Sequence, residues 1–287
     1  MKLCRFGDNR FGLVRDDKVL DVSGALAALG HHAYPLPNYD LAVANLDTLR
    51  MAVEAAAGSA HAHPLKGLTL LSPIANPGKI VAAPVNYQKH FDEATAEPET
   101  FSRAQVRKIQ EIGLFLKASS SLVGPGEGLA LRFPTRRTDH EVELAVVIGR
   151  IADRVPASQA FDYIAGYAIG LDMTTRGVEE RSLRKSSDGY SVLGPLFVTA
   201  DEIANPGNLD LELLVNGERR QSANTRDLIL DIPALIEFAS SFYTLHPGDI
   251  LMTGTPEGVG PVQTGDVITA TIQGIGSMEV RVRAPDA

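Results

Sequence analysis

The stretch TDHEVELAVVIGR, Thr138 to Arg150, joins an apolar run to two acidic residues at its start. From Leu144 onward it is typical of a strand that is buried on both faces. Glu141 and Glu143 stand two positions apart, and because side chains alternate along a strand, both project from the same face. The sequence therefore predicts a buried strand whose first residues carry two neighbouring carboxylates, and these need a partner of opposite charge.

A second apolar strand, in AGYAIGLDMTTR, also ends at an acidic residue, Asp172. Three carboxylates in a partly buried place repel one another unless a cation joins them. Oxygen ligands favour Mg²⁺, Mn²⁺ or Ca²⁺ over zinc, and no His or Cys cluster accompanies them. The alternative is that Glu141 and Glu143 lie on the solvent face of an edge strand while Asp172 caps a turn.

The composition bounds the class of protein. The chain has 287 residues, of which 44% are hydrophobic and 22% charged, enough for one sizeable core or a core with a small accessory unit. Its one cysteine, Cys4, excludes an internal disulfide and favours a reducing compartment. No stretch has the length and apolarity of a membrane span, so we expect a cytoplasmic protein without a membrane partner. A formal net charge of −8 disfavours nucleic acid as a partner.

The arrangement of short segments predicts a strand-dominated α+β fold. We expect a small antiparallel meander at the start, a helix over 40–57, and a second unit that begins near residue 70 and is rich in short β-branched strands. Helices are predicted at 157–163 and from the N-cap Asp231 to Leu245, before His246-Pro247-Gly248. We therefore predict a small N-terminal α/β domain over 1–70 and a larger domain over 71–287.

Four motifs carry a resemblance to a known family: DHEVELAVVIG, GYAIGLDMTTR, RKSSDGYSVLGP and DILMTGTPEGVGPVQTGD. Together they resemble the fumarylacetoacetate hydrolase family, from about Lys79 to the C-terminus. The resemblance implies a mixed β-roll catalytic domain and a homodimer. It also implies a divalent metal, usually Mg²⁺ or Mn²⁺, held by Glu141, Glu143 and Asp172. Its substrates would be small α-keto acids with a second carbonyl or carboxylate.

In VNYQKHFDEA, His90 and Glu93 are three residues apart, so on a helix they share a face and the carboxylate could orient the imidazole. The spacing N-Y-x-x-H-x-x-E is shared with hydrolytic and decarboxylating members of the family, in which the His activates water. A bare pair of this kind is more often a solvated helix face.

Other residues are candidates for substrate contact. Lys185 matches a family lysine that faces the substrate's oxygens, and there it would stabilise an enolate. The hydroxyls and close backbone of Thr253, Gly254 and Thr255 suit a carboxylate, although the loop is also a Gly/Pro turn. Glu179 stands where many members have Gln, so either it pairs with a base such as Arg176, Arg181 or Arg184, or the substrate's distal group differs. These arginines, with Lys117, Arg136 and Arg137, form either a positive funnel for a dianionic substrate or ordinary surface charge.

The resemblance and the His/Glu pair predict a metal-dependent hydrolase that cleaves a carbon–carbon bond in an acylpyruvate such as fumarylpyruvate or maleylpyruvate, in aromatic or sugar-acid catabolism. Decarboxylation of oxaloacetate-like acids, tautomerisation, and isomerisation of hydroxydienedioates use the same metal-enolate chemistry and are the alternatives. A metal-dependent binding protein and a purely structural protein are the rivals from other classes. The lid between Phe91 and Ile112, with the N-terminal unit, would line the distal pocket and set the substrate.

Overall fold

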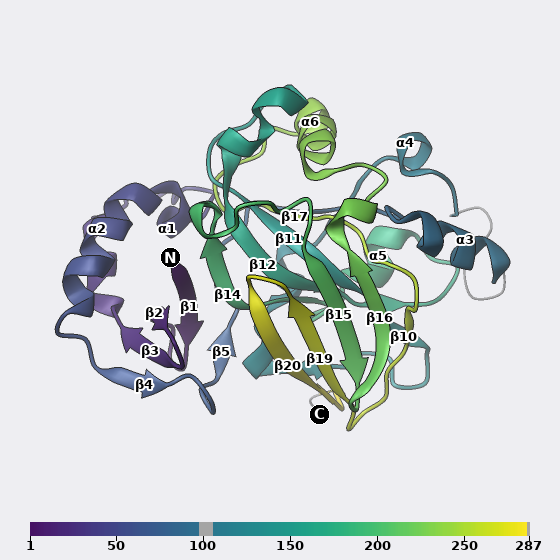
Figure 1. Ribbon diagram of the computed structural model, residues 1–287, viewed down its shortest axis with the longest axis horizontal. Coiled ribbons are helices and arrows are strands. Elements are labelled where there is room, and N and C mark those ends of the chain that lie inside the picture. The colour runs from purple at the N-terminus through teal and green to yellow at the C-terminus, as the bar shows by residue number, and fades with distance from the viewer. Residues whose placement is uncertain (98–105, 286–287) are drawn as a thin grey trace.

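The computed structural model describes residues 1–97 and 106–285, and its centre is a long mixed sheet (Figure 1). The strand order is β4-β3-β2-β1-β14-β12-β11-β17-β6-β7, with β5 beside β1 and β8 beside β14. The middle of the sheet consists of three antiparallel strands, β11 (Val142–Ile148), β12 (Ile164–Asp172) and β14 (Ser191–Thr199), in which every residue is buried. The strand predicted after Glu141 is confirmed.

The N-terminal segment extends this sheet. The predicted meander is present as β1 (Lys2–Phe6), β2 (Arg10–Arg15) and β3 (Lys18–Asp21), followed by β4 (Ala62–Pro64). Strand β1 pairs antiparallel with β14, and β5 (Leu70–Leu71) pairs with β1. The expected helix over 40–57 is present as α1 (Leu41–Ala44) and α2 (Leu46–Ala57), which lie at one end of the molecule in Figure 1. One sheet thus runs through both predicted domains, and the boundary at residue 70 stays a prediction.

At the far edge of the sheet, β17 (Ile250–Met252) pairs with β11 and runs parallel to β6 (Ile80–Ala82), which pairs with β7 (Phe115–Lys117). The short strand β8 (Leu122–Val123) runs parallel to β14.

Two smaller sheets complete the fold. The five-stranded sheet has the order β16-β15-β19-β20-β9, and the three-stranded sheet has the order β13-β10-β18. Leu213 of β15 and Ile268 of β19 belong to the same apolar core as Leu144 and Val146 of β11. Strand β16 lies beside the three-stranded sheet, where Gln221 contacts His140 of β10. The bounds are β9 (Leu129–Ala130), β10 (Thr138–His140), β13 (Thr174–Thr175), β15 (Asp210–Val215), β16 (Glu218–Asn224), β18 (Gly260–Pro261), β19 (Val267–Ile272) and β20 (Gly276–Arg283).

Helices cover the ends of the sheets, and two of them differ in detail from the sequence prediction. The segment Ala157–Tyr163 is helical, as predicted, in the 3₁₀ form (η4). Helix α6 (Ile232–Phe242) has the predicted N-cap, in which the Asp231 side chain accepts a hydrogen bond from Ala234 N. It ends earlier than the predicted Leu245, because Leu245 pairs with Ala152 in a β-bridge with two backbone hydrogen bonds.

The remaining helices are α3 (Gln88–Ala96), α4 (Ile109–Ile112) and α5 (Arg181–Lys185), with the short 3₁₀ turns η1 (Ser23–Leu29), η2 (Ser119–Ser121), η3 (Pro125–Glu127), η5 (Ala200–Glu202) and η6 (Thr225–Asp227). Part of the predicted lid, residues 98–105, lies outside the described residues.

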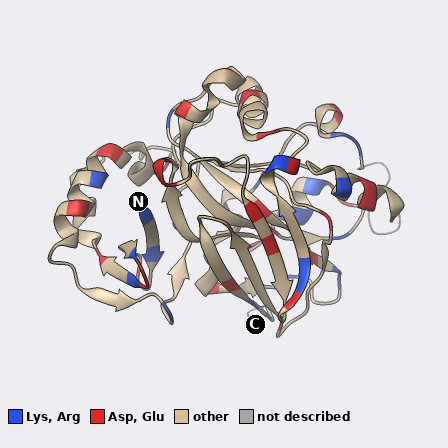
Figure 2. Cartoon of the chain, viewed as in Figure 1, with Lys and Arg blue, Asp and Glu red and all other residues tan. Residues whose placement is uncertain are grey.

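The fold class is confirmed as strand-rich α+β with mixed sheets. None of the helices in the described ranges is long and apolar enough to cross a membrane. Figure 2 shows basic residues interspersed with acidic ones along the ribbon.

Candidate active site

The antiparallel pairing of β11 with β12 brings three carboxylates together. Val142 pairs with Leu171, and Asp172 N donates to Glu141 O at 2.9 Å, so the start of one strand lies beside the end of the other. Ligand oxygens of Glu141, Glu143 and Asp172 all lie within 4.8 Å of one another, and the three residues are at most 4% exposed. The predicted convergence of these carboxylates is present, and the solvent-face alternative for them is wrong.

The electrostatics of the trio depend on which cations each carboxylate meets. Burial raises the pKa of Glu143, and the charges of Asp172 and Glu141 raise it further. Burial also opposes the ionisation of Glu141, but Lys185 and Arg176 outweigh it and lower the pKa of that carboxyl to about 2. Glu143 is therefore the member of the trio that most lacks positive charge.

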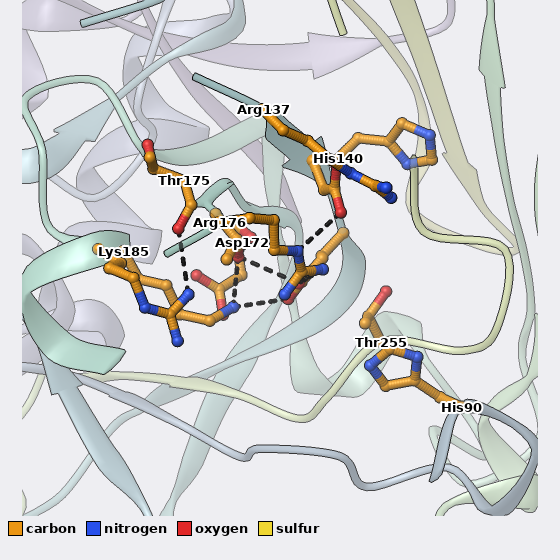
Figure 3. A network of polar contacts seen from close by, with 12 residues as sticks. His90, Arg137, His140, Asp172, Thr175, Arg176, Lys185 and Thr255 are labelled. Atoms are coloured by element: carbon orange, nitrogen blue, oxygen red, sulfur yellow. Dashed lines mark hydrogen bonds and ion pairs between the residues drawn. The ribbon is translucent and has the colours of Figure 1, made fainter. Parts of the chain in front are cut away.

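Lys185, Arg176 and Lys117 surround the other two carboxylates. Figure 3 shows Lys185 and Arg176 near Asp172. Lys185 Nζ donates to Glu141 Oε2 and Asp172 Oδ2 at 2.7 Å each and to Thr174 Oγ1 at 2.6 Å. Arg176 donates through Nη2 to Glu141 Oε1 at 3.1 Å. These contacts use all three hydrogens of the Lys185 ammonium, so a substrate contact would require it to exchange one acceptor.

Lys117 lies behind the trio. It is 3% exposed and donates to Asp172 Oδ1 and, at 2.9 Å, to Tyr190 O. Burial lowers the pKa of Lys117, and the charge of Asp172 opposes that shift. The side chain is not among those that line the pocket described below, so this structure places it as a partner of Asp172.

Helix α3 presents His90 and Glu93 on one face, as their spacing predicts. His90 Nδ1 lies 2.9 Å from Glu93 Oε2, and the second oxygen of Glu93 accepts from Gly258 N at 2.9 Å. His90 is 4% exposed, which excludes the solvated-face alternative for the histidine. Glu93 thus connects the imidazole to the loop after β17, and Figure 3 shows His90 beside Thr255 of that loop.

The three residues of the 253–255 loop take different positions. Thr253 Oγ1 donates to Leu144 O at 2.9 Å, and Gly254 N donates to Glu143 Oε2 at 2.7 Å. Thr255 faces the pocket, and its hydroxyl contacts Gln221 Nε2 at 2.8 Å. The loop therefore supplies Glu143 with a hydrogen bond and the pocket with one hydroxyl.

Glu179 lies outside the pocket lining, in the turn before α5. Its carboxylate accepts two hydrogen bonds from Arg136, at 3.0 and 2.8 Å, and Arg184 Nε donates to its backbone oxygen at 2.8 Å. The pKa of Glu179 is lowered, chiefly by the hydrogen bond from Arg136. The predicted pairing of Glu179 with a base is present. The base that binds its carboxylate is Arg136, which precedes β10, and not Arg176, Arg181 or Arg184.

One pocket joins these groups. His90, Thr255, Lys185 and the carboxylate trio line it, together with the cations Arg176, Arg181 and Arg184 and the apolar residues Ala83, Pro84, Val85, Ala94, Val106 and Phe115. The pocket therefore offers a carboxylate cluster, a histidine and several arginines to one small ligand.

Sequence reasoning missed four residues that build the site. Asp139 binds both Arg137 and Arg176 at 2.7 Å, and Thr174 donates to Glu141 at 3.0 Å. Asn86 holds the turn at Val85, whose φ of +48° is unusual for a β-branched residue, through hydrogen bonds to Leu230 and Thr253. Gln221 is the fourth. Asp139, Thr174 and Asn86 lie within the quoted motifs DHEVELAVVIG, GYAIGLDMTTR and VNYQKHFDEA, whereas Gln221 lies in none of them. The contacts of Asn86 and Gln221 join segments that are distant in sequence.

The donor set fits a hard divalent cation. Three buried carboxylates offer oxygen atoms only, and no sulfur or imidazole ligand joins the cluster in the described ranges. Glu143, with its raised pKa, would gain most from such a charge.

Comparisons with known proteins agree with this geometry. The maleylpyruvate hydrolase of Aquipseudomonas alcaligenes is 54% identical over 99% of this chain and 100% of its own. A mitochondrial oxaloacetate tautomerase of Bos taurus is 42% identical over 60% of this chain and 81% of its own. The crystal structure of a maleylpyruvate hydrolase from Sphingobium sp. SYK-6 in complex with manganese(II) and pyruvate is 39% identical, covers both chains completely and superposes with a TM-score of 0.84. Residues 79–283 match the family of the fumarylacetoacetate (FAA) hydrolase C-terminal domain, and the chain belongs to that family.

Proposed function

We propose that this protein is a divalent-metal-dependent hydrolase that cleaves an acylpyruvate of the maleylpyruvate or fumarylpyruvate type into a carboxylate and pyruvate. The observation that carries the proposal is the pairing of His90 with Glu93 in the pocket that also holds the carboxylate trio. The full-length similarity to a maleylpyruvate hydrolase supports the substrate class.

Glu141, Glu143 and Asp172 would hold the metal, and Mg²⁺ or Mn²⁺ suits their oxygens, with Ca²⁺ as a substitute. Manganese in a related structure supports this choice. When bound, the ion polarises the 2-oxo acid end of the substrate.

His90 would act as general base. Glu93 holds the imidazole in place, and the histidine would take a proton from water as the water attacks the distal carbonyl. The carbon–carbon bond then breaks toward the pyruvate unit, which takes up a proton, and the other fragment leaves as a carboxylate. Water supplies all the atoms that are added.

The remaining polar groups would bind substrate oxygens. Lys185 could exchange its contact with Thr174 for an oxygen that gains negative charge as the bond breaks. Arg176 and the hydroxyl of Thr255 line the same space. Contacts of Lys117, Glu179, Thr253 and Gly254 with the substrate stay predictions, because in this structure their contacts are with the protein.

We also propose that the active protein is a homodimer. The exposed apolar side chains Val178 and Leu183, beside the pocket-lining residues Gly177 and Arg184, support a partner at this end of the molecule. Sedimentation of the purified protein would test this: a single monomeric species at micromolar concentration contradicts it.

The decisive assay follows the enol absorbance of maleylpyruvate, fumarylpyruvate and acetylpyruvate with Mn²⁺- or Mg²⁺-loaded protein and identifies the products. We expect pyruvate and the matching carboxylate in equal amounts. If every acylpyruvate persists unchanged, the hydrolase proposal fails.

Oxaloacetate tautomerisation is the second candidate, favoured by the similarity to the bovine tautomerase. It interconverts keto and enol forms without water and without loss of carbon. Rapid enol–keto exchange of oxaloacetate, with acylpyruvates left intact, would select this activity instead.

A further inference from the structure

Gln221 lies in β16, is 1% exposed, and contacts four groups through its side-chain amide. Its Oε1 accepts from Val142 N at 3.1 Å and lies 3.1 Å from His140 Nδ1. Its Nε2 donates to Thr255 Oγ1 at 2.8 Å and to Pro256 O at 2.9 Å. A residue from another sheet therefore connects the strand of the carboxylates to the loop that carries Thr255.

Two backbone groups fix which way the amide points. Val142 N can only donate and Pro256 O can only accept, so the oxygen of Gln221 faces Val142 and its nitrogen faces Pro256. The Thr255 oxygen must then accept from Gln221, and its own hydrogen is left to be donated elsewhere. In residues 1–97 and 106–285, Gln221 is the sole hydrogen-bond partner of that hydroxyl.

Thr255 is 3% exposed and lines the pocket beside His90 and Glu143. Keto acids present carboxylate and carbonyl oxygens, which only accept hydrogen bonds, so a hydroxyl held as a donor is the useful orientation. We infer that Gln221 is a positioning residue for substrate recognition: it fixes the Thr255 hydroxyl as a donor to a substrate oxygen. This role rests on the proposed keto-acid substrate.

Gln221→Glu is the sharpest variant. A carboxylate still accepts from Val142 N, but it cannot donate, so the Thr255 hydroxyl turns toward it and away from the pocket. The measured quantity is the dissociation constant of acetylpyruvate, in the Mn²⁺-loaded protein with His90→Ala to prevent hydrolysis. We expect Gln221→Glu and Thr255→Val each to weaken binding about tenfold or more, as for loss of a hydrogen bond to a charged group.

The double variant Gln221→Glu/Thr255→Val tests whether Gln221 affects binding through Thr255 or by stabilising the site as a whole. If Gln221 acts through Thr255, adding Gln221→Glu to Thr255→Val causes no further loss beyond about twofold. Thr255→Ser, which keeps the hydroxyl, should restore binding. The Mn²⁺ affinity of Gln221→Glu should stay unchanged, because the hydrogen bond to the carboxylate strand persists.

Gln273→Glu is the matched control, since Gln273 accepts a backbone hydrogen bond in a turn between β19 and β20 and does not line the pocket. Gln221→Met removes both the donor and the acceptor of the side chain without adding a charge. It should also weaken acetylpyruvate binding. Losses that add in the double variant, or a fall in Mn²⁺ affinity equal to the fall in acetylpyruvate affinity, overturn the inference. Absence of hydrolysis by the His90-containing enzyme, with a non-additive cycle, overturns the proposed function alone.

Discussion

Glu141 is the carboxylate at which most charges of the site meet. It accepts from Lys185, Arg176 and Thr174. Burial opposes its ionisation, but the charges of Lys185 and Arg176 lower the pKa of Glu141 to about 2. The negative charge of the Glu141 carboxylate therefore serves both its ion pairs with Lys185 and Arg176 and its proposed role as a metal ligand.

Glu141→Gln removes that charge with little change in size. We expect the free energy of unfolding in chelator to fall by about 3 kcal/mol, because two buried cations lose a partner. Mn²⁺ binding should weaken at least about a hundredfold. Chemical denaturation and calorimetry measure the two effects. Glu218→Gln, at an exposed position paired with Arg220, is the control and should change stability by less than about 0.5 kcal/mol. If Glu141→Gln binds Mn²⁺ with the affinity of the unchanged protein, Glu141 is not a metal ligand.

His90 differs from Glu141 because its pairing with Glu93 places it for proton transfer. His90→Ala should keep Mn²⁺ affinity and lower kcat for acylpyruvate hydrolysis by about 10² to 10⁴, the usual contribution of a general base. Steady-state kinetics and metal titration of the same sample check both halves. If His90→Ala turns over substrate as fast as the unchanged protein, the general base is a group other than His90.

At the scale of elements, the site depends on the contact between α3 and the loop after β17. Gly258 N donates to Glu93 Oε1, and Gly258 has φ +87°, a conformation that glycine adopts without strain. A Cβ atom there would lie 2.0 Å from Arg220 O, so the loop must shift if the residue is enlarged.

Gly258→Ala is therefore expected to separate Glu93 from the loop. Hydrolysis should fall at least about tenfold, and stability should fall by about 1 to 3 kcal/mol from backbone strain. Mn²⁺ affinity should change little, because Glu143 and Asp172 lie in β11 and β12 and Glu141 directly precedes β11. Gly217→Ala controls for strain alone: its φ is +81° and a Cβ atom would meet nothing within 4 Å. Equal losses of activity in both variants would dismiss the contact as a requirement for hydrolysis.

At the scale of the whole molecule, the proposed metal would join the start of β11 to the end of β12, two neighbouring buried strands of the central sheet. Saturating Mn²⁺ at a hundred times its dissociation constant should add about 2.7 kcal/mol of stability. For a chain of this size we expect chelator to lower Tm by about 5 to 10 °C. Differential scanning calorimetry in Mn²⁺ and in EDTA measures the shift. Equal Tm values would contradict metal binding to the folded state.

Local patterns were enough to predict the strands that carry the carboxylates, and they predicted that His90 and Glu93 would share a face if their segment formed a helix. A strand's alternation puts Glu141 and Glu143 on one face, and helical spacing puts His90 beside Glu93. Each of these patterns depends only on a few neighbouring residues, so a single sequence is enough to predict it. The end of α6 was predicted wrongly because Leu245 pairs with Ala152, nearly a hundred positions away in the chain.

The sequence by itself determined the fold class, through its many short β-branched segments, and the carboxylate pair, through the two-residue period of a strand. The spacing of His90 and Glu93 put both side chains on one face of a helix. Only the tertiary structure decided that Arg136 binds Glu179, that Gln221 fixes Thr255, and that β1 continues the central sheet beside β14. The reason is physical: hydrogen bonds and strand registers between distant segments depend on how the chain closes in space, and no local period specifies them.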